Sequence, residues 1–127
     1  MRRLMAIALP LLLAVPTVGQ GQDGSDDTEI GSGLASYYGD ELAGNRTASG
    51  ERFDPAGFTA AHRTLAFGSK VRVTNLANGK SVVVRVNDRG PWGGGRVIDI
   101  SHAAAKEIGM HRSGTARVSM TLVDGGD

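Results

Sequence analysis

Two aspartates near the middle of the chain have the residue type and spacing that proton transfer requires. Asp88 follows the β-branched run 82–86, and Asp99 follows the short apolar pair at 97–98. Between them lie Gly90, Pro91 and the triple glycine 93–95, which predict a loop with almost no side-chain bulk. We therefore expect Asp88 and Asp99 to end two strands on the floor of a groove that a polymer can approach.

Two further acids, Glu51 and Asp54, lie in the segment 44–54, which has few apolar positions and no clear periodicity. This composition predicts a long ordered loop, and a long loop in a small domain usually serves a function. Glu51 and Asp54 are therefore candidates for the same site. The alternative is that they cap backbone amides or pair with Arg46 and Arg52.

The histidines do not indicate a metal centre. His62, His102 and His111 show no metal-ligand spacing, and the chain has no cysteine. We expect neither a metal nor another cofactor. His62 is a candidate site residue, although a lone histidine is more often packed and hydrogen bonded than catalytic.

The surrounding pattern predicts short strands and one helix. Residues 34–39 form a first strand, in which Tyr37 and Tyr38 point to opposite faces. The runs 70–75 and 82–86 flank Asn-Gly and form a hairpin. Ser101 caps a helix over 102–108, and 117–123 is a closing strand. About six strands and one helix imply a small closed barrel.

The first residues are expected to direct export. Arg2 and Arg3 precede an apolar run at 4–15 and small or polar residues up to Gly21, which is typical of a signal peptide cleaved near 19–21. Removing residues 1–21 leaves 12 basic against 13 acidic residues, so nucleic acid is a poor candidate partner. Residues 22–32 are polar and glycine-rich and predict a disordered linker, so the folded domain is expected at 33–123.

Several motifs in order resemble the rare lipoprotein A family. They are Gly-Leu-Ala-Ser-Tyr-Tyr-Gly at 33–39, Arg-Thr-Ala-Ser-Gly-Glu-Arg-Phe-Asp at 46–54, Thr-Ala-Ala-His-Arg-Thr-Leu at 59–65, Val-Arg-Val-Asn-Asp-Arg-Gly-Pro at 84–91 and Arg-Val-Ile-Asp-Ile-Ser at 96–101. The resemblance implies a six-stranded double-psi β-barrel. It also implies a lytic transglycosylase that cleaves peptidoglycan strands, preferably without stem peptides, and leaves 1,6-anhydro-muramic acid ends.

By similarity to expansins and the membrane-bound lytic transglycosylase A, Asp99 matches the essential acid and Asp88 the second aspartate. Ser36 lies where those proteins place a hydroxyl near the acid. The expected mechanism has Asp99 as acid and base, with Asp88 and Glu51 raising its pKa, and His62 holding the site by hydrogen bonds. The expected sugar contacts are Tyr37, Tyr38, Arg89 and Trp92. The alternative role of Asp99 is to stabilise the N-terminus of the helix.

The sequence departs from the family in two respects. Members named for the family are lipoproteins, whereas this chain has no cysteine, so we expect a monomer free in the periplasm or outside the cell, without a lipid anchor. Many members also carry a C-terminal peptidoglycan-binding repeat that directs them to the septum, and septal targeting is not carried over here. The alternative function is an expansin-like module that binds or loosens the wall without cleaving it, and a secreted structural or inhibitor-like domain is a third possibility.

Overall fold

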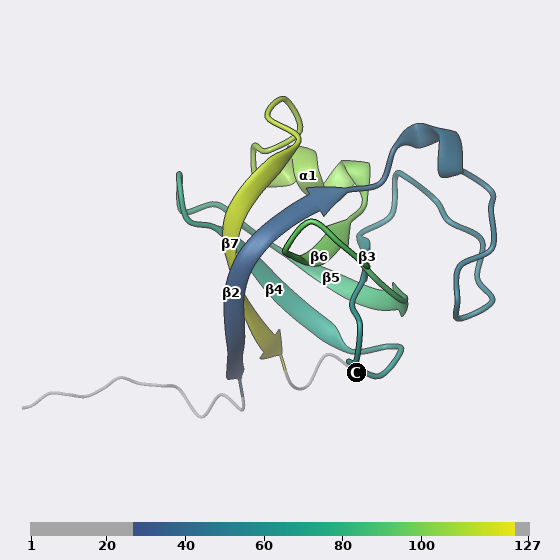
Figure 1. The fold of residues 1–127 in the computed structure, drawn as a ribbon, viewed down its shortest axis with the longest axis horizontal. Helices are drawn as coiled ribbons and strands as arrows, with labels where there is room; N and C mark the ends of the chain where they lie inside the picture. The colour runs from purple at the N-terminus through teal and green to yellow at the C-terminus, as the bar shows by residue number, and fades with distance from the viewer. Residues whose placement is uncertain (1–26, 124–127) are drawn as a thin grey trace, which may run out of the picture.

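Six strands close into a barrel in the computed structural model, which describes residues 27–123 (Figure 1). The strands are β2 (Thr28–Tyr37), β3 (Thr59–Ala61), β4 (Lys70–Asn75), β5 (Ser81–Asp88), β6 (Arg96–Ile100) and β7 (Thr115–Val123). Around the barrel they follow the order β2-β6-β3-β5-β4-β7. The predicted six-stranded barrel with one helix is therefore confirmed, and each strand pairs with a neighbour on both sides along at least part of its length.

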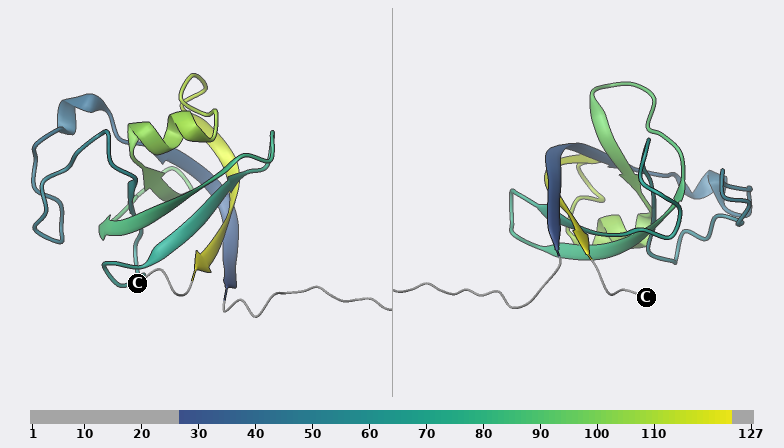
Figure 2. Two further views of the ribbon diagram at one scale, coloured as in Figure 1. Left: turned by 180° about the vertical axis from the view of Figure 1, so that it is seen from behind. Right: turned by 90° about the horizontal axis from the view of Figure 1, so that it is seen from below.

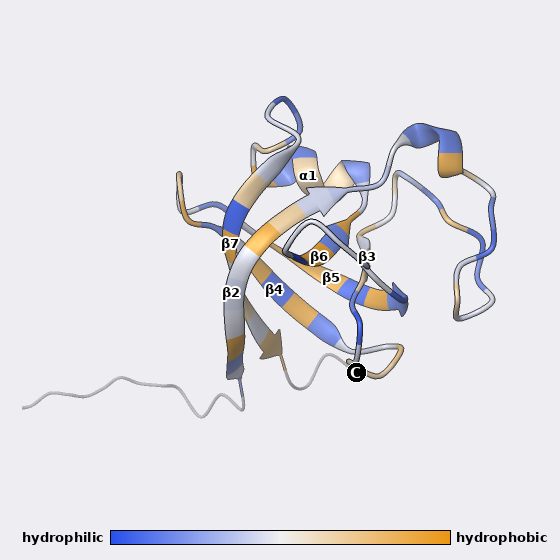
Figure 3. Ribbon diagram, in the orientation of Figure 1, coloured by the Kyte–Doolittle hydropathy of each residue, from blue (hydrophilic) through white to orange (hydrophobic). Residues whose placement is uncertain are grey.

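The hairpin of β4 and β5 shows why this sequence forms strands. Val71 and Val73 of β4 and Val84 of β5 are buried, while their neighbours are more exposed. This two-residue period places the valines in the barrel interior (Figure 3). Gly79 has a φ of +78°, a conformation that suits glycine in the tight turn. The hairpin predicted from Asn-Gly is confirmed.

The helix α1 (His102–Glu107) covers one end of the barrel (Figure 2). Ser101 has extended backbone angles and its hydroxyl accepts a hydrogen bond from the Ala104 amide, so it is the N-cap, as predicted. Ala104 and Ala105 are fully buried against the core. Asp99 takes no part in this cap.

The start of the folded domain differs from the prediction. Strand β2 begins at Thr28, and residues 28–32, which were expected to be part of a disordered linker, pair with the end of β7, for example Thr28 with Leu122 and Ser32 with Ser119. The composition of 28–32 misled the prediction because backbone hydrogen bonds to a neighbouring strand do not require apolar side chains. Residues 22–26 and the predicted signal peptide at 1–21 lie outside the described residues.

A long ordered loop between β2 and β3 projects from the side of the barrel, as Figures 1 and 2 show. It contains the short 3-10 helix η3 (Asp40–Leu42) and a bridge between Arg46 and Arg52. The Ser49 amide donates to the Asn87 carbonyl at 3.2 Å, which ties the loop to the end of β5. The loop predicted at 44–54 is confirmed. Between residues 27 and 123, no helix has the length and apolar character needed to cross a membrane.

Candidate active site

The strand register brings Asp88 and Asp99 to the same level of the barrel. Ala61 of β3 pairs with Asp88 of β5 on one side and with Asp99 of β6 on the other. Neighbouring strands lie about 4.8 Å apart, so the two Cα atoms are separated by roughly 10 Å. Ser36 of β2 pairs with Asp99 from the far side of β6. The barrel therefore aligns Ser36, Asp99, Ala61 and Asp88 in one row.

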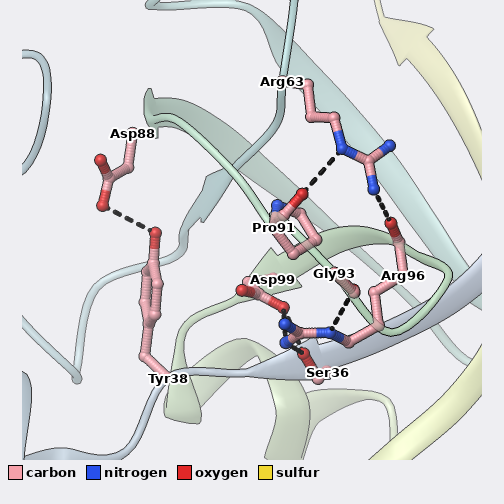
Figure 4. Close-up of polar contacts among 8 residues, drawn as sticks. All are labelled: Ser36, Tyr38, Arg63, Asp88, Pro91, Gly93, Arg96 and Asp99. Atoms are coloured by element: carbon pink, nitrogen blue, oxygen red, sulfur yellow. Dashed lines mark hydrogen bonds and ion pairs between the residues drawn. The ribbon is translucent and has the colours of Figure 1, made fainter.

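Asp99 is held through one carboxylate oxygen. Its Oδ1 accepts hydrogen bonds from the Ser36 hydroxyl and, at 3.0 Å, from Nη1 of Arg96 (Figure 4). The same Nη1 lies 2.7 Å from the Ser36 Oγ. The Asp99 side chain is 15% exposed, and within residues 27–123 its Oδ2 has no hydrogen-bond partner. One oxygen of Asp99 is thus fixed, and the other is free to meet a ligand.

Both carboxylate oxygens of Asp88 accept hydrogen bonds. Its Oδ1 accepts from the amides of Ala48 and Arg89, both at 2.8 Å, and its Oδ2 accepts from the Tyr38 hydroxyl at 2.9 Å. Asp88 therefore links the projecting loop, the end of β5 and the end of β2. Its three donors make it an anchor for the surrounding site.

Tyr38 stands between the two aspartates (Figure 4). Burial, together with the negative charge and the hydrogen bond of Asp88 and the charge of Asp99, raises the pKa of the Tyr38 phenol far above its usual value. Tyr38 consequently stays a neutral hydrogen-bond donor. Its ring packs edge-on against Phe53 with 4.8 Å between ring centroids.

A pocket opens beside this cluster, between the barrel and the projecting loop. Asp88 and Tyr38 form its barrel side. The loop supplies the remaining lining residues, which are Leu42, Asn45, Arg46, Thr47 and Phe53. The pocket therefore presents a carboxylate, a phenol and a guanidinium at one place.

Glu51 does not contact either aspartate. Its carboxylate binds Arg85 through two hydrogen bonds of 2.6 and 3.0 Å and Asn87 through one of 3.1 Å. The hydrogen bond from Arg85, followed by that from Asn87, lowers the pKa of Glu51. These contacts give no support to the expected action of Glu51 on Asp99. They fasten the loop to β5, with Arg85 as the partner in place of Arg46 or Arg52.

Asp54 lies outside the cluster and acts as a turn cap. Its Oδ1 accepts a hydrogen bond of 2.9 Å from the Ala56 amide, and the residue is exposed. This is the alternative that the sequence left open for Asp54. The structure therefore gives Asp54 a local structural role.

His62 follows Ala61 directly and organises the segment after β3. Its Nδ1 accepts hydrogen bonds from the amides of Thr64 and Leu65, both at 3.2 Å, and its own amide donates to the Asp88 carbonyl at 3.1 Å. The His62 ring therefore holds the segment that follows β3, and its backbone amide ties that segment to Asp88.

The His62 imidazole is expected to take up its proton at a lower pH than an unperturbed imidazole does. Burial, with the charges of Arg63 and Arg89, lowers its pKa from 6.5. Because the unfolded chain then binds the proton more tightly, His62 should lower the free energy of unfolding as the pH falls from about 6.5 through its folded pKa. A titration of the His62 Cε1 proton by NMR is expected to give a midpoint below 6.5.

The control for the predicted pH dependence of stability is His62→Asn, whose side-chain oxygen can also accept from nearby amides. Urea unfolding of both proteins between pH 7.5 and 5 should show a steeper loss of stability in the wild type. A midpoint at or above 6.5 would contradict the expectation.

The remaining predicted sugar contacts fall into two groups. Arg89 donates to the carbonyls of His62 and Leu65 at 3.1 and 2.8 Å and lies over the Phe67 ring, so it fastens the segment 62–67. Tyr37 packs against the core and donates to the His111 carbonyl at 2.6 Å. Trp92, in the glycine loop between β5 and β6, is 74% exposed, so its ring is available to a ligand. As predicted, one of the adjacent tyrosines packs inward, and the other lines the pocket.

Arg96 is the site residue that the sequence did not reveal. A cation three residues before an acid does not predict contact within a strand, because residues i and i+3 lie on opposite faces. Arg96 reaches Asp99 because it enters β6 directly from the glycine loop, where its Nε donates to the Gly93 carbonyl at 3.2 Å. The part of the chain that the structure describes has no group of three His, Asp or Glu residues placed to hold a metal ion.

Comparison with known proteins identifies the family. Residues 30–120 match the family model described as lytic transglycolase. The chain belongs to the lytic transglycolase family. This membership confirms the resemblance to rare lipoprotein A and, with the closed six-stranded barrel, the double-psi β-barrel fold.

Two relatives of this lytic transglycolase family member are named endolytic peptidoglycan transglycosylase RlpA, one of them as probable. The chain is 53% identical over 117 residues to the probable endolytic peptidoglycan transglycosylase RlpA of Synechocystis sp. (strain PCC 6803), covering 92% of this chain and 36% of the relative. It is 59% identical over 92 residues to endolytic peptidoglycan transglycosylase RlpA of Pseudomonas aeruginosa (strain UCBPP-PA14), covering 72% of this chain and 27% of the relative. The chain thus spans about a third or less of the length of these two relatives.

Solved structures share the fold at lower identity. The apo-expansin of Clavibacter michiganensis superposes with a TM-score of 0.60 at 20% identity, covering 80% of this chain and 52% of the expansin. The Streptomyces papain inhibitor gives a TM-score of 0.58 at 23% identity, covering 76% of this chain and 93% of the inhibitor. These similarities concern the fold alone.

Proposed function

We propose that this protein is a lytic transglycosylase that cleaves peptidoglycan glycan strands, preferably those without stem peptides, and leaves 1,6-anhydro-muramic acid ends. The observation that carries the proposal is Asp99, which is fixed through Oδ1 and free at Oδ2 in the row that also contains Asp88. The names of the relatives support the same activity.

A single carboxyl group suffices for this reaction. Asp99, protonated on Oδ2, gives its proton to the glycosidic oxygen as the bond from that oxygen to the anomeric carbon breaks. The C6 hydroxyl of the same muramic acid residue attacks the anomeric carbon, and its proton returns to Oδ2. The ring closes as a 1,6-anhydro sugar, so no water is consumed and Asp99 ends the cycle as it began.

The neighbouring residues keep this geometry in place. Ser36 donates to Oδ1, which orients the carboxyl and leaves Oδ2 directed to the substrate. Asp88 holds the neutral Tyr38 phenol beside the pocket. The exposed Trp92 ring supplies a surface on which a sugar can stack. His62 and Arg89 support these residues through the segment 62–67.

The proposed substrate determines where the protein acts. Peptidoglycan lies outside the cytoplasmic membrane, so the protein acts in the periplasm or outside the cell after export. We propose that it works as a monomer on glycan strands, without a cofactor or nucleic acid partner.

The competing function is an expansin-like module that binds the wall without cleaving it. The ion pair between Arg96 and Asp99 favours this alternative, because an ionised carboxylate can accept hydrogen bonds from sugar hydroxyls but has no proton to donate. The two functions differ in their products.

Analysis of the products tests the proposal. Purified sacculi, with and without prior removal of stem peptides by an amidase, are incubated with the protein, and the soluble products are analysed by mass spectrometry. We expect anhydro-muramic acid ends, which lack one water relative to reducing ends, and more of them after amidase treatment. Reducing ends would indicate a hydrolase, and bound strands without products would indicate the wall-binding module.

A further inference from the structure

Arg96 lies between the candidate acid and the glycine loop, and Figure 4 shows its side-chain hydrogen bonds to Asp99, Ser36 and Gly93. Its Nη1 contacts the Ser36 hydroxyl at 2.7 Å and the Asp99 Oδ1 at 3.0 Å, and its Nε contacts the Gly93 carbonyl at 3.2 Å. These contacts fix the plane of the guanidinium beside the carboxyl group. The side chain is nevertheless 32% exposed, so a ligand can reach it.

The backbone around Arg96 is fastened as well. Arg63 donates from Nε to the Pro91 carbonyl at 2.7 Å and from Nη2 to the Arg96 carbonyl, so it ties the two ends of the glycine loop together. Gly94 has a φ of +69°, and a Cβ atom there would lie 3.3 Å from the Arg96 Nε. The loop lies close over the guanidinium because it carries no side chain at this point. Arg96 is therefore a positioned residue rather than a freely moving surface charge.

Part of the guanidinium is left without a partner. Its five N–H groups comprise one on Nε and two on each terminal nitrogen. Within residues 27–123, the hydrogen bonds of the Arg96 side chain use Nε and Nη1, and Nη2 makes none. Two charged donors thus remain on the guanidinium that pairs with Asp99. Planar guanidinium donors favour a carboxylate or phosphate over a neutral acceptor.

The substrate of the proposed reaction carries a carboxylate close to the reacting carbon. Muramic acid bears a lactyl ether on C3 of the same ring whose C1 is attacked. The lactyl carboxylate is free and negatively charged where the stem peptide has been removed, and it is a neutral amide where the peptide is attached. A site that holds C1 beside Asp99 therefore brings the lactyl group into the neighbourhood of Arg96.

We propose that Arg96 is a specificity-determining residue, which binds the free lactyl carboxylate of muramic acid through Nη2 while Nη1 retains Asp99. This inference rests on the proposed function and adds the group by which the substrate is recognised. Charge-assisted hydrogen bonds are stronger than neutral ones, and a factor of ten in rate corresponds to about 1.4 kcal/mol. We expect the contact to favour the free carboxylate by about 10- to 100-fold in kcat/KM.

The test compares two substrates that differ only at the lactyl carboxyl group, which is charged in one and a neutral amide in the other. Both are glycan strands stripped of stem peptides by an amidase, and in one of them the lactyl carboxylates are converted to methylamides with a carbodiimide and methylamine. The wild-type protein is expected to cleave the free acid about 10- to 100-fold more efficiently than the methylamide. Equal cleavage of both strands would overturn the role of Arg96 and leave the proposed activity intact.

Variants assign the preference to Arg96. Arg96→Gln is expected to bring the ratio of the two kcat/KM values close to one, and Arg96→Lys to retain part of the preference because it keeps the charge. The control is Arg72→Gln, which also removes a guanidinium paired with an aspartate, Asp27 at 3.1 Å, but on β4. The control should keep the wild-type ratio. An Arg96→Gln protein that still discriminates as the wild type does would overturn the proposal.

A binding measurement on the wild type keeps the proposal testable if a variant fails to fold or if no strand is cleaved. The NMR signal of the Arg96 side-chain Nε–H, assigned by its absence from Arg96→Lys, is followed during titration with N-acetylmuramic acid and with its methylamide. We expect a saturable shift with the acid and at least a tenfold weaker response to the methylamide. Equal responses, or none with either compound, would overturn the proposal, whereas the absence of anhydro products alone would count against the proposed function.

Discussion

Replacing Asp99 by asparagine is expected to lower the rate of anhydro-end formation from stem-peptide-free strands by about 10³-fold or more. The amide has nearly the same shape and can still accept from Ser36 through its oxygen, but it cannot give a proton to the leaving oxygen or take one from the C6 hydroxyl. The measurement is the initial rate of release of anhydro-ended fragments, quantified by mass spectrometry at saturating strand concentration.

The matched control is Asp54→Asn, because Asp54 is an exposed aspartate that caps a local turn. Its rate should stay within about twofold of the wild type, since asparagine also caps such turns. Asp88→Asn is informative beside it, because its amide oxygen can still accept from the two backbone amides, whereas an amide nitrogen in place of Oδ2 cannot accept from the Tyr38 hydroxyl. Full activity of the Asp99→Asn protein would exclude Asp99 as the acid and base.

Replacing Ile100 by alanine is expected to cost about 2–5 kcal/mol of unfolding free energy. Ile100 is fully buried in β6, and its neighbours in the register are Tyr37 of β2 and Ala60 of β3. The smaller side chain leaves a cavity in a close-packed interior, so the loss exceeds the transfer free energy of the missing carbon atoms. Thermal unfolding should show a fall in the melting temperature of about 10–30 °C.

Leu76→Ala is the control for this prediction, because it removes the same number of carbon atoms from a residue that is 57% exposed. Its melting temperature should fall by no more than a few degrees. If the two variants lost the same stability, Ile100 would not be part of a close-packed core.

The elements of the barrel could be predicted where local chemistry decides them. The alternation of valines with polar residues in β4 and β5, the Asn-Gly turn and the cap at Ser101 each carry a local signal. The start of β2 could not be predicted in this way. Residues 28–32 form a strand because β7 offers its backbone hydrogen bonds, and the paired residues are 87 to 94 positions apart in the chain, from Ser32 with Ser119 to Thr28 with Leu122.

In the candidate site, too, some features could be predicted from the sequence and others could not. Ser36, Asp88 and Asp99 could be selected because they match family motifs, and the two aspartates also end predicted strands. The structure aligns the three residues through Ala61 and β2. Glu51 and Asp54 are candidates because they lie in a long loop. In the structure Glu51 pairs with Arg85, and Asp54 caps a local turn. The composition of a loop shows which acidic residues it contains, but it does not predict which residues they bind.

The sequence by itself determined the strand pattern, the helix cap and the family motifs, because hydrophobic period, turn residues and capping act between near neighbours in the chain. Only the tertiary structure decided that Asp99 meets Arg96 and Ser36 while Asp88 holds Tyr38. Those pairs depend on the register between strands that are distant in the sequence, and a shift of one residue in register would turn each side chain to the opposite face.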